Sequence, residues 1–218
     1  MRYTIREFKD RPDWLAWRHL GIGSSDAAII MGKSRFKTAK QLLIEKAGPI
    51  VPENDENKYI KERGNRIETV VREFLEGYNG YSLSPANFEH VRFGYLRASL
   101  DGVNTDRKII TEIKLLSSQS LERFNRNTEG YQKFAAAKLQ GIVPPEYMPQ
   151  IQHQLFITGY DTCIFAGACE IRGKALDGDS IAQVIVERDE KYIRELLQKE
   201  FDFWLELDKL IYTEGELE

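Results

Sequence analysis

Residues 101–114 carry the side chains best suited to chemistry in this chain. Asp101 precedes a glycine, and Glu112 and Lys114 stand one residue apart within the apolar run 109–116. Side chains of a strand alternate between its two faces, so Glu112 and Lys114 are predicted to share a face. Burying two charges is costly unless a partner compensates them. The pattern is typical either of an Asp-Gly turn followed by a surface ion pair, or of a charged site against the core.

The segment between these residues has the composition of a turn. Residues 104–108 are polar, and a chain that folds back there brings Asp101 close to Glu112. Two carboxylates that share a site repel each other, and a divalent cation relieves that repulsion. Oxygen ligands at this density suit Mg²⁺ or Mn²⁺. Lys114 could then hold a water molecule or stabilise a developing negative charge.

Composition narrows the class of protein. The 218 residues predict one domain over residues 1–218, and 42% hydrophobic residues is ordinary for a globular protein. The net charge of −3 and the pI of about 5.8 are not those of a basic DNA-binding module, so a nucleic-acid site must be a local patch. We expect no membrane span and no signal peptide. Cys163 and Cys169 lie too far apart on one strand for a disulfide, which favours a reducing, cytoplasmic compartment.

A glycine and serine turn follows the first predicted helix, at residues 10–20. In the segment 21–26, Ser24 or Ser25 is predicted to cap a helix over residues 26–31. A helix start is also an anion site, because its N–H groups are free. Arg18 lies upstream, and a basic cluster follows downstream, namely Lys33, Arg35, Lys37 and Lys40. These residues favour phosphate binding, although a plain cap and a solvated basic face are the alternatives.

The remaining elements follow from periodicity and turn residues. Helices are predicted at 38–47, 58–77, 131–140, 146–158 and 188–210. Strands are predicted at 109–116, 163–171 and 181–187, with strands and turns over 81–100. Residues 117–124 are predicted as a helix or turn, 51–57 and 125–130 as surface loops, 172–179 as a hairpin-type loop, and 212–218 as a frayed tail.

Two of these helices carry polar candidates. Glu68 lies at the edge of the apolar stripe of helix 58–77, as a boundary residue with a cationic partner or as a third site acid. Tyr147, Gln150 and Gln154 share one face of helix 146–158, which is either simply solvated or positioned beside a site. His153 is interpreted as structural, because no second His or Cys lies at ligand spacing.

Together these residues resemble a known family. The ordered set is Arg18, Ser25, Glu68, Asp101, Glu112-Ile113-Lys114 and Gln150. The chain resembles the phage-type recombination exonucleases, the lambda exonuclease and YqaJ-like viral recombinase family, within the nuclease superfamily that has a PD-(D/E)xK core. The resemblance runs from about Trp14 to Gly167, and its order and spacing are more specific than its separate pieces. Leu100 stands where the superfamily name places proline.

The resemblance implies a fold and an activity. The fold is α/β (α+β), a central mixed β-sheet flanked by helices with a restriction-endonuclease-like core. The activity is Mg²⁺-dependent 5′-to-3′ digestion of one strand of linear double-stranded DNA to mononucleotides. The remaining 3′ single strand then serves recombination by annealing. The implied partners are duplex ends with a 5′-phosphate, a single-strand annealing protein and two further copies in a homotrimer ring. The implied setting is the cytoplasm of a bacterial host, with a phage or prophage gene.

The resemblance also implies roles for individual residues. Asp101 and Glu112 are expected to ligate Mg²⁺, for which Mn²⁺ can substitute, together with the main-chain carbonyl of Ile113. Glu68 adds a carboxylate, directly or through water. Lys114 is expected to orient and activate the attacking water, with help from Gln150. Arg18 and Ser25 are expected to bind the terminal 5′-phosphate, and Arg35 is a secondary phosphate contact.

Two other functions remain open from the sequence. One is an endonuclease on the same PD-(D/E)xK core, which would cut a covalently closed circular duplex that an exonuclease leaves intact. The other is a non-catalytic DNA-binding protein on the same fold. The triplet Asp101, Glu112 and Lys114 argues against the second, since a binding role has no evident need for it.

Overall fold

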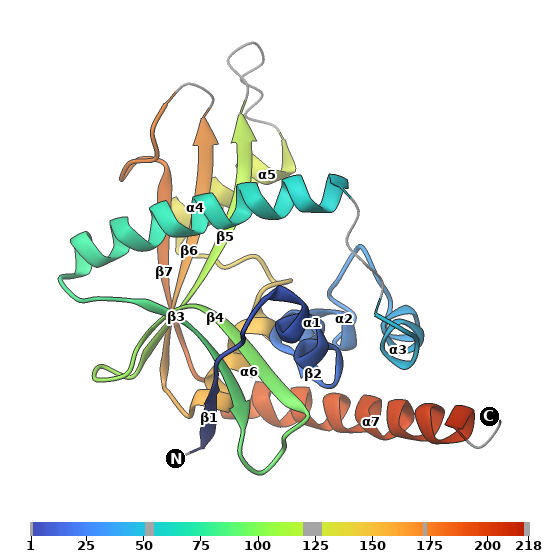
Figure 1. The fold of residues 1–218 in the computed structure, drawn as a ribbon. Coiled ribbons are helices and arrows are strands. Elements are labelled where there is room, and N and C mark those ends of the chain that lie inside the picture. The colour runs from blue at the N-terminus through green and yellow to red at the C-terminus, as the bar shows by residue number, and fades with distance from the viewer. Residues whose placement is uncertain (1, 51–54, 120–127, 172–173, 216–218) are drawn as a thin grey trace.

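A seven-stranded sheet forms the centre of the protein, described here from a computed structural model that covers residues 2–50, 55–119, 128–171 and 174–215. The strands are β1 (Tyr3–Arg6), β2 (Ile22–Gly23), β3 (Ser84–His90), β4 (Leu96–Asn104), β5 (Ile109–Gln119), β6 (Thr162–Ile171) and β7 (Ile181–Glu187). Their order is β1-β3-β4-β5-β6-β7, and β2 pairs with β4 (Figure 1). The pairs β5–β6 and β2–β4 are parallel and the others antiparallel, which confirms the predicted mixed sheet.

Helices surround this sheet. They are α1 (Arg11–His19), α2 (Ser24–Ile30), α3 (Ala39–Ala47), α4 (Asp55–Asn79), α5 (Glu129–Gln140), α6 (Met148–Thr158) and α7 (Glu190–Gly215). Local sequence sets several of their ends. The side chain of Asp10 caps α1, and Thr38 with Gln41 forms a capping box at α3. Gly141 and Gly159 end α5 and α6 in the left-handed conformation that glycine adopts without strain.

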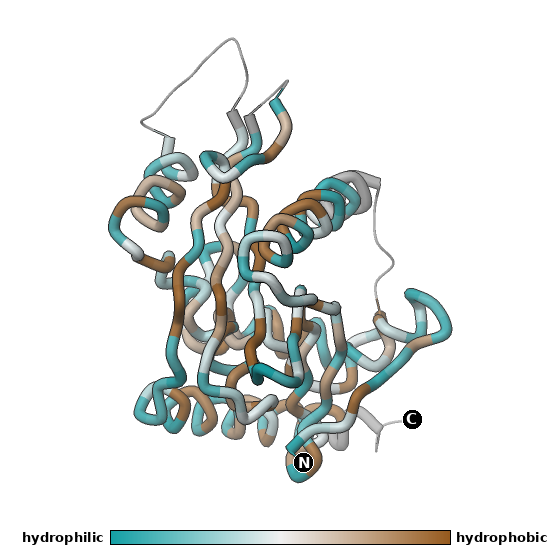
Figure 2. Tube along the Cα trace, turned by 90° about the vertical axis from the view of Figure 1, so that its left-hand side faces the viewer, coloured by the Kyte–Doolittle hydropathy of each residue, from teal (hydrophilic) through white to brown (hydrophobic). Residues whose placement is uncertain are grey.

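The two faces of the sheet bury separate cores. On one face, α4 packs Ile67, Val71 and Leu75 against apolar side chains of β5, β6 and β7. On the other face, α5 and α6 pack against the alternate residues of the same strands, with Phe165 and Ile151 fully buried. Figure 2 shows hydrophobic segments along the central strands. The alternation therefore gives each face of β5 its own surroundings, which decides where its charged residues point.

Several predicted boundaries are wrong. The helix or turn predicted at 117–124 does not begin at residue 117, because residues 117–119 extend β5 and pair in parallel with the end of β6. Residues 120–127 lie outside the described part of the chain. Helix α4 begins at Asp55, inside the predicted loop 51–57, and α7 continues to Gly215 through the predicted frayed tail. Strand β1 was not predicted.

Cys163 and Cys169 are buried free thiols on β6, as expected. None of the described helices is long and apolar enough to cross a membrane.

Helix α6 is anchored by buried polar side chains. Gln152 bonds the main chain at both ends of its amide, donating to the carbonyl of Glu187 at 2.9 Å and accepting from the N–H of Asp189 at 2.9 Å. His153 lies 2.7 Å from Glu200 of α7 through Nδ1 and 3.0 Å from the carbonyl of Arg97 through Nε2. His153 is therefore structural, as predicted, and α6 is fixed to β4, to α7 and to the connection between β7 and α7.

The His153–Glu200 pair makes stability depend on pH. Burial lowers the pKa of His153, but the Glu200 carboxylate and the Arg97 carbonyl raise it above its ordinary value. The stabilisation is therefore complete below about pH 6.5 and is lost as the pH rises through the folded-state pKa. We expect the difference in unfolding free energy between wild type and His153→Gln, measured in urea titrations, to shrink as the pH rises above about 6.5. A constant difference would contradict this assignment.

Candidate functional site

The β4–β5 hairpin forks where the candidate residues lie. The antiparallel ladder runs from Asn104 and Ile109 to Gly102 and Thr111, the last pair of this register. Beyond it, the Asp101 side chain accepts a hydrogen bond from the N–H of Ile113, with Oδ2 2.7 Å from the nitrogen. The Asp101 carboxylate thus occupies a main-chain N–H of β5 that a neighbouring strand would otherwise bond. The prediction that folding back brings Asp101 beside the Glu112 segment is confirmed.

Glu112 is fully buried at the base of this fork. Its Oε1 lies 2.5 Å from Lys114 Nζ, and its Oε2 accepts a hydrogen bond of 2.6 Å from Gln154 Nε2 of α6. The predicted shared face of Glu112 and Lys114 is confirmed. Lys114 remains 29% exposed, with its ammonium 5.7 Å from the centre of the Tyr147 ring, so the lysine links the buried carboxylate to solvent.

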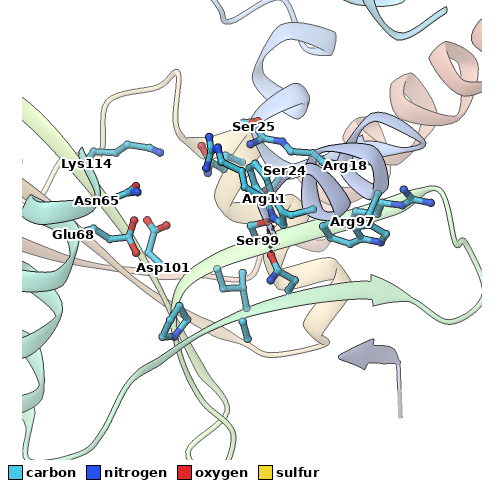
Figure 3. Close-up of a pocket in the computed structure, with 18 residues that line it drawn as sticks. Arg11, Arg18, Ser24, Ser25, Asn65, Glu68, Arg97, Ser99, Asp101 and Lys114 are labelled. Atoms are coloured by element: carbon cyan, nitrogen blue, oxygen red, sulfur yellow. Dashed lines mark hydrogen bonds between the residues drawn. The ribbon is translucent and has the colours of Figure 1, made fainter. Parts of the chain in front are cut away.

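Glu68 approaches the fork from α4. Arg72, one turn further along, donates through Nη1 to Glu68 Oε1 at 3.0 Å and to the main-chain carbonyl of Asp101 at 2.9 Å. Glu68 therefore has the cationic partner of a boundary residue and also faces Asp101, as Figure 3 shows. The role of Arg72 was missed; its only sequence signal was the spacing of four residues from Glu68.

The charges at the fork do not balance. Burial raises the pKa of Asp101 well above its ordinary value, and the charge of Glu112 raises it further. Burial also raises the pKa of Glu68, in spite of Arg72. Burial lowers the pKa of Lys114, but the Glu112 and Asp101 charges outweigh it and raise that pKa, so the lysine is protonated and acts as a donor. The site consequently favours one more positive charge.

These oxygen atoms fit a hard divalent cation, but only in part. Among the residues described, no three His, Cys, Asp or Glu side chains are arranged to hold a metal by themselves. Asp101 and Glu112 could supply carboxylate oxygens, and Glu68 is turned toward Arg72, which suits a contact through water. Mg²⁺ usually keeps several waters and needs one or two carboxylates, so these oxygen atoms could supply part of its coordination shell. The carbonyl of Ile113 as a ligand stays a prediction.

A second group of polar residues lies where α1 meets α2. Arg18 donates through Nη2 to the hydroxyl of Ser25, and its guanidinium lies 5.0 Å from the centre of the Trp14 ring. The indole N–H of Trp14 contacts Asn87 Oδ1 at 3.1 Å and Ser99 Oγ at 3.2 Å. The ring is thereby fixed to β3 and β4. The structure brings Arg18 and Ser25 together, as predicted.

The predicted cap of α2 is wrong. The helix begins at Ser24 with Gly23 as its N-cap, so neither serine caps it. The N–H of Gly23 donates instead to Asp26 Oδ2 at 2.9 Å. Lys46 of α3 lies 3.0 Å from the same oxygen and donates to the Gly21 carbonyl at 2.6 Å. Asp26 thus caps the helix start while paired with Lys46, 20 positions later, and the serine hydroxyls are left for other contacts.

Both groups line one cleft of about 470 Å³ (Figure 3). We call one side the acidic end, formed by Glu68, Asp101 and Lys114, and the other the arginine end, formed by Arg11, Arg18 and Ser25. Gln150, Asn65 and Ser24 also line the cleft. Arg35 is outside this lining and pairs with Glu129 of α5 at 2.7 Å, so its phosphate contact stays a prediction.

Helix α6 supplies the amides of the site. Gln150 lines the cleft, and Gln154, one turn further on, is the amide that contacts Glu112. The sequence placed both on one face with Tyr147, and this is confirmed. The sequence left open whether this face is solvated or lies beside a site, and it did not indicate the contact of Gln154 with Glu112, because that contact depends on how α6 packs against β5.

Solved structures share this fold. The alkaline exonuclease LHK-Exo of Laribacter hongkongensis, in complex with dAMP, matches with a TM-score of 0.69 at 21% identity, over 95% of this chain and 98% of that chain. A phage-related exonuclease of Haemophilus somnus 129PT matches with a TM-score of 0.61 at 19% identity, over 92% of this chain and 99% of that chain. These likenesses establish the class of fold, a restriction-endonuclease-like sheet as found in exonucleases.

Sequence comparison gives the family. The chain belongs to the YqaJ-like viral recombinase domain family, whose model matches residues 13–161. The protein YqaJ of Bacillus subtilis (strain 168) is 27% identical over 200 residues, 89% of this chain and 55% of YqaJ. Protein D345L of African swine fever virus (strain Badajoz 1971 Vero-adapted) is 28% identical over 182 residues, 72% of this chain and 50% of D345L. The chain therefore spans about half the length of these relatives.

Proposed function

We propose that this chain is a Mg²⁺-dependent exodeoxyribonuclease that digests one strand of linear double-stranded DNA from its 5′ end, releasing mononucleotides. The 3′ single strand that remains would feed recombination by strand annealing. One observation carries the proposal: a single cleft joins the acidic end, above the buried Glu112, to the arginine end. Hydrolysis and recognition of a DNA end need these two kinds of surface side by side.

The acidic end suits phosphodiester hydrolysis. Asp101 and Glu112 would hold Mg²⁺, which when bound polarises the phosphate and lowers the pKa of a water. Lys114, held protonated by Glu112, can donate a hydrogen bond to the attacking water or to a phosphate oxygen. Arg72 keeps the Glu68 carboxylate and the Asp101 main chain together, so the acids keep their spacing. Gln150 at the cleft wall can orient the same water.

The arginine end suits a terminal phosphate. A guanidinium binds phosphate through paired donors, and Trp14 restricts the motion of the Arg18 side chain. The hydroxyl of Ser25 accepts from Arg18, so its own proton is available to a phosphate oxygen. That the similar LHK-Exo was crystallised with dAMP supports a site of nucleotide size. A phosphate held here would place the next phosphodiester toward the acidic end, which accounts for release of mononucleotides.

Digestion of labelled DNA tests the proposal. Linear duplexes that carry a label at either the 5′ or the 3′ end, with and without a 5′-phosphate, are incubated with the protein in Mg²⁺ or in EDTA. We expect labelled mononucleotides from the 5′ end at once, Mg²⁺ dependence, and survival of a covalently closed circular duplex. Cutting of the circle would support the endonuclease alternative. Binding without digestion under all metal conditions would support the non-catalytic one.

Lys114→Ala tests the chemistry. The lysine donates to the reacting groups and makes little contact with the duplex, so removing it should lower kcat by about 100-fold or more. Duplex binding, measured by fluorescence anisotropy in EDTA, should persist. Lys199→Ala is the matched control, because Lys199 lies on α7 and faces Glu195 on the same helix. Near-normal digestion by Lys114→Ala would refute the assigned site.

Arg18→Ala tests end recognition. Losing a charge-assisted contact of roughly 1.5–3 kcal/mol should slow digestion of 5′-phosphorylated ends by about 10- to 150-fold. Ends with a 5′-hydroxyl lack the phosphate that Arg18 would bind, so their rate should change much less. Arg107→Ala, at the turn of the β4–β5 hairpin and stacked on Tyr81, is the control. An equal loss on both kinds of end would mean that Arg18 serves only the fold.

We also propose that three copies form a ring around the duplex and act beside a single-strand annealing protein. A chain with a net charge of −3 must concentrate its basic groups to hold DNA, and a ring directs them inward. Light scattering at micromolar concentration should give the mass of a trimer, and duplex binding should weaken steeply as salt rises. A monomer under all conditions would rule out the ring.

A further inference from the structure

One buried amide contacts the carboxylate below the cleft. Gln154 is completely buried on α6, and its Nε2 donates to Glu112 Oε2 at 2.6 Å. The same nitrogen lies 3.5 Å from the hydroxyl of Ser24, which lines the cleft at the start of α2. The amide therefore stands between the buried acid of β5 and the helix that carries Ser25.

The orientation of this amide is fixed by chemistry. An ionised carboxylate only accepts hydrogen bonds, so the NH₂ group of Gln154 must face Glu112 and its carbonyl oxygen must point away. That oxygen is buried and has no hydrogen-bond partner among the described residues. Gln152, two residues earlier and equally buried, uses both ends of its amide on the main chain. Gln152 therefore only holds the main chain together, whereas the NH₂ group of Gln154 donates to Glu112 and its carbonyl oxygen has no partner among the described residues.

We propose that Gln154 is a positioning residue for Glu112, an inference that rests on the proposed hydrolytic function. By holding Oε2, the amide turns Oε1 toward Lys114, 2.5 Å away, and toward the acidic end. Without it, the carboxylate loses one of its two anchors and can rotate. Partners that orient a metal-binding carboxylate in this way typically change metal affinity or activity by about 10- to 100-fold when removed.

Gln154→Met separates positioning from folding, because methionine has similar length but no donor. We expect kcat on a 5′-phosphorylated duplex to fall by about 10- to 100-fold, with KM and duplex binding in EDTA unchanged. The affinity for Mn²⁺, measured by calorimetry without DNA, should fall in the same range. Gln152→Met is the matched control: it should lower the melting temperature while kcat per folded molecule and Mn²⁺ affinity stay at wild-type values.

Each outcome bears on the inference. Wild-type kcat and Mn²⁺ affinity in Gln154→Met would overturn it, as would equal losses in Gln152→Met. If Gln154→Met does not fold, Gln154→Asn keeps the donors but is too short to reach Glu112, and the same losses are expected. If the wild-type protein digests no DNA, the proposed function fails, and Mn²⁺ affinity alone decides whether Gln154 positions Glu112.

Discussion

The buried Glu112 carboxylate is the constraint on which the arrangement of this protein depends. A charge removed from water must find partners, and here they are an ammonium on the same strand and an amide from a helix. The amide reaches the carboxylate only if α6 packs closely against β5. That packing is held in turn by His153, which ties α6 to β4 and to α7. The need of the buried Glu112 carboxylate for a hydrogen-bond donor thus constrains where α6 lies in the apolar core.

The fork between β4 and β5 is the second condition. Ladder hydrogen bonds would normally continue, but Asp101 accepts the Ile113 N–H with its side chain and the strands separate. The separation makes room for the cleft, and α4 enters beside it with Glu68 and Arg72. The cleft therefore lies where β4 and β5 end their pairing, and residues of α1, α2 and α4 complete its walls.

Features that depend on near neighbours in sequence were predictable. The turn at 104–108 and the alternation of β5 placed Asp101, Glu112 and Lys114 correctly, because a hairpin and a strand have fixed periods. The helix predicted at 38–47 was likewise found, as α3 with Thr38 as its N-cap. Spacing also put Gln150 and Gln154 on one face, but could not tell which amide meets the carboxylate.

Features that depend on distant partners were not predictable. The buried ion pair between Asp26 at the start of α2 and Lys46 of α3 is not revealed by any pattern around Ser24. The extension of β5 to Gln119 follows from parallel pairing with β6, about 50 residues later, against a local preference for a turn. The pairing of Arg35 with Glu129 likewise joins two segments that sequence alone leaves separate.

Strand β4 also carries residues that belong to both ends of the cleft. Ser99, which holds Trp14 beneath Arg18, and Asp101 are two residues apart on this strand, a separation of about 6.6 Å along an extended chain. One continuous segment of backbone thus connects the arginine end to the acidic end. If a terminal phosphate is held at one end and a bond is cut at the other, both sites rest on the same strand, so the distance between them is the same at every cut.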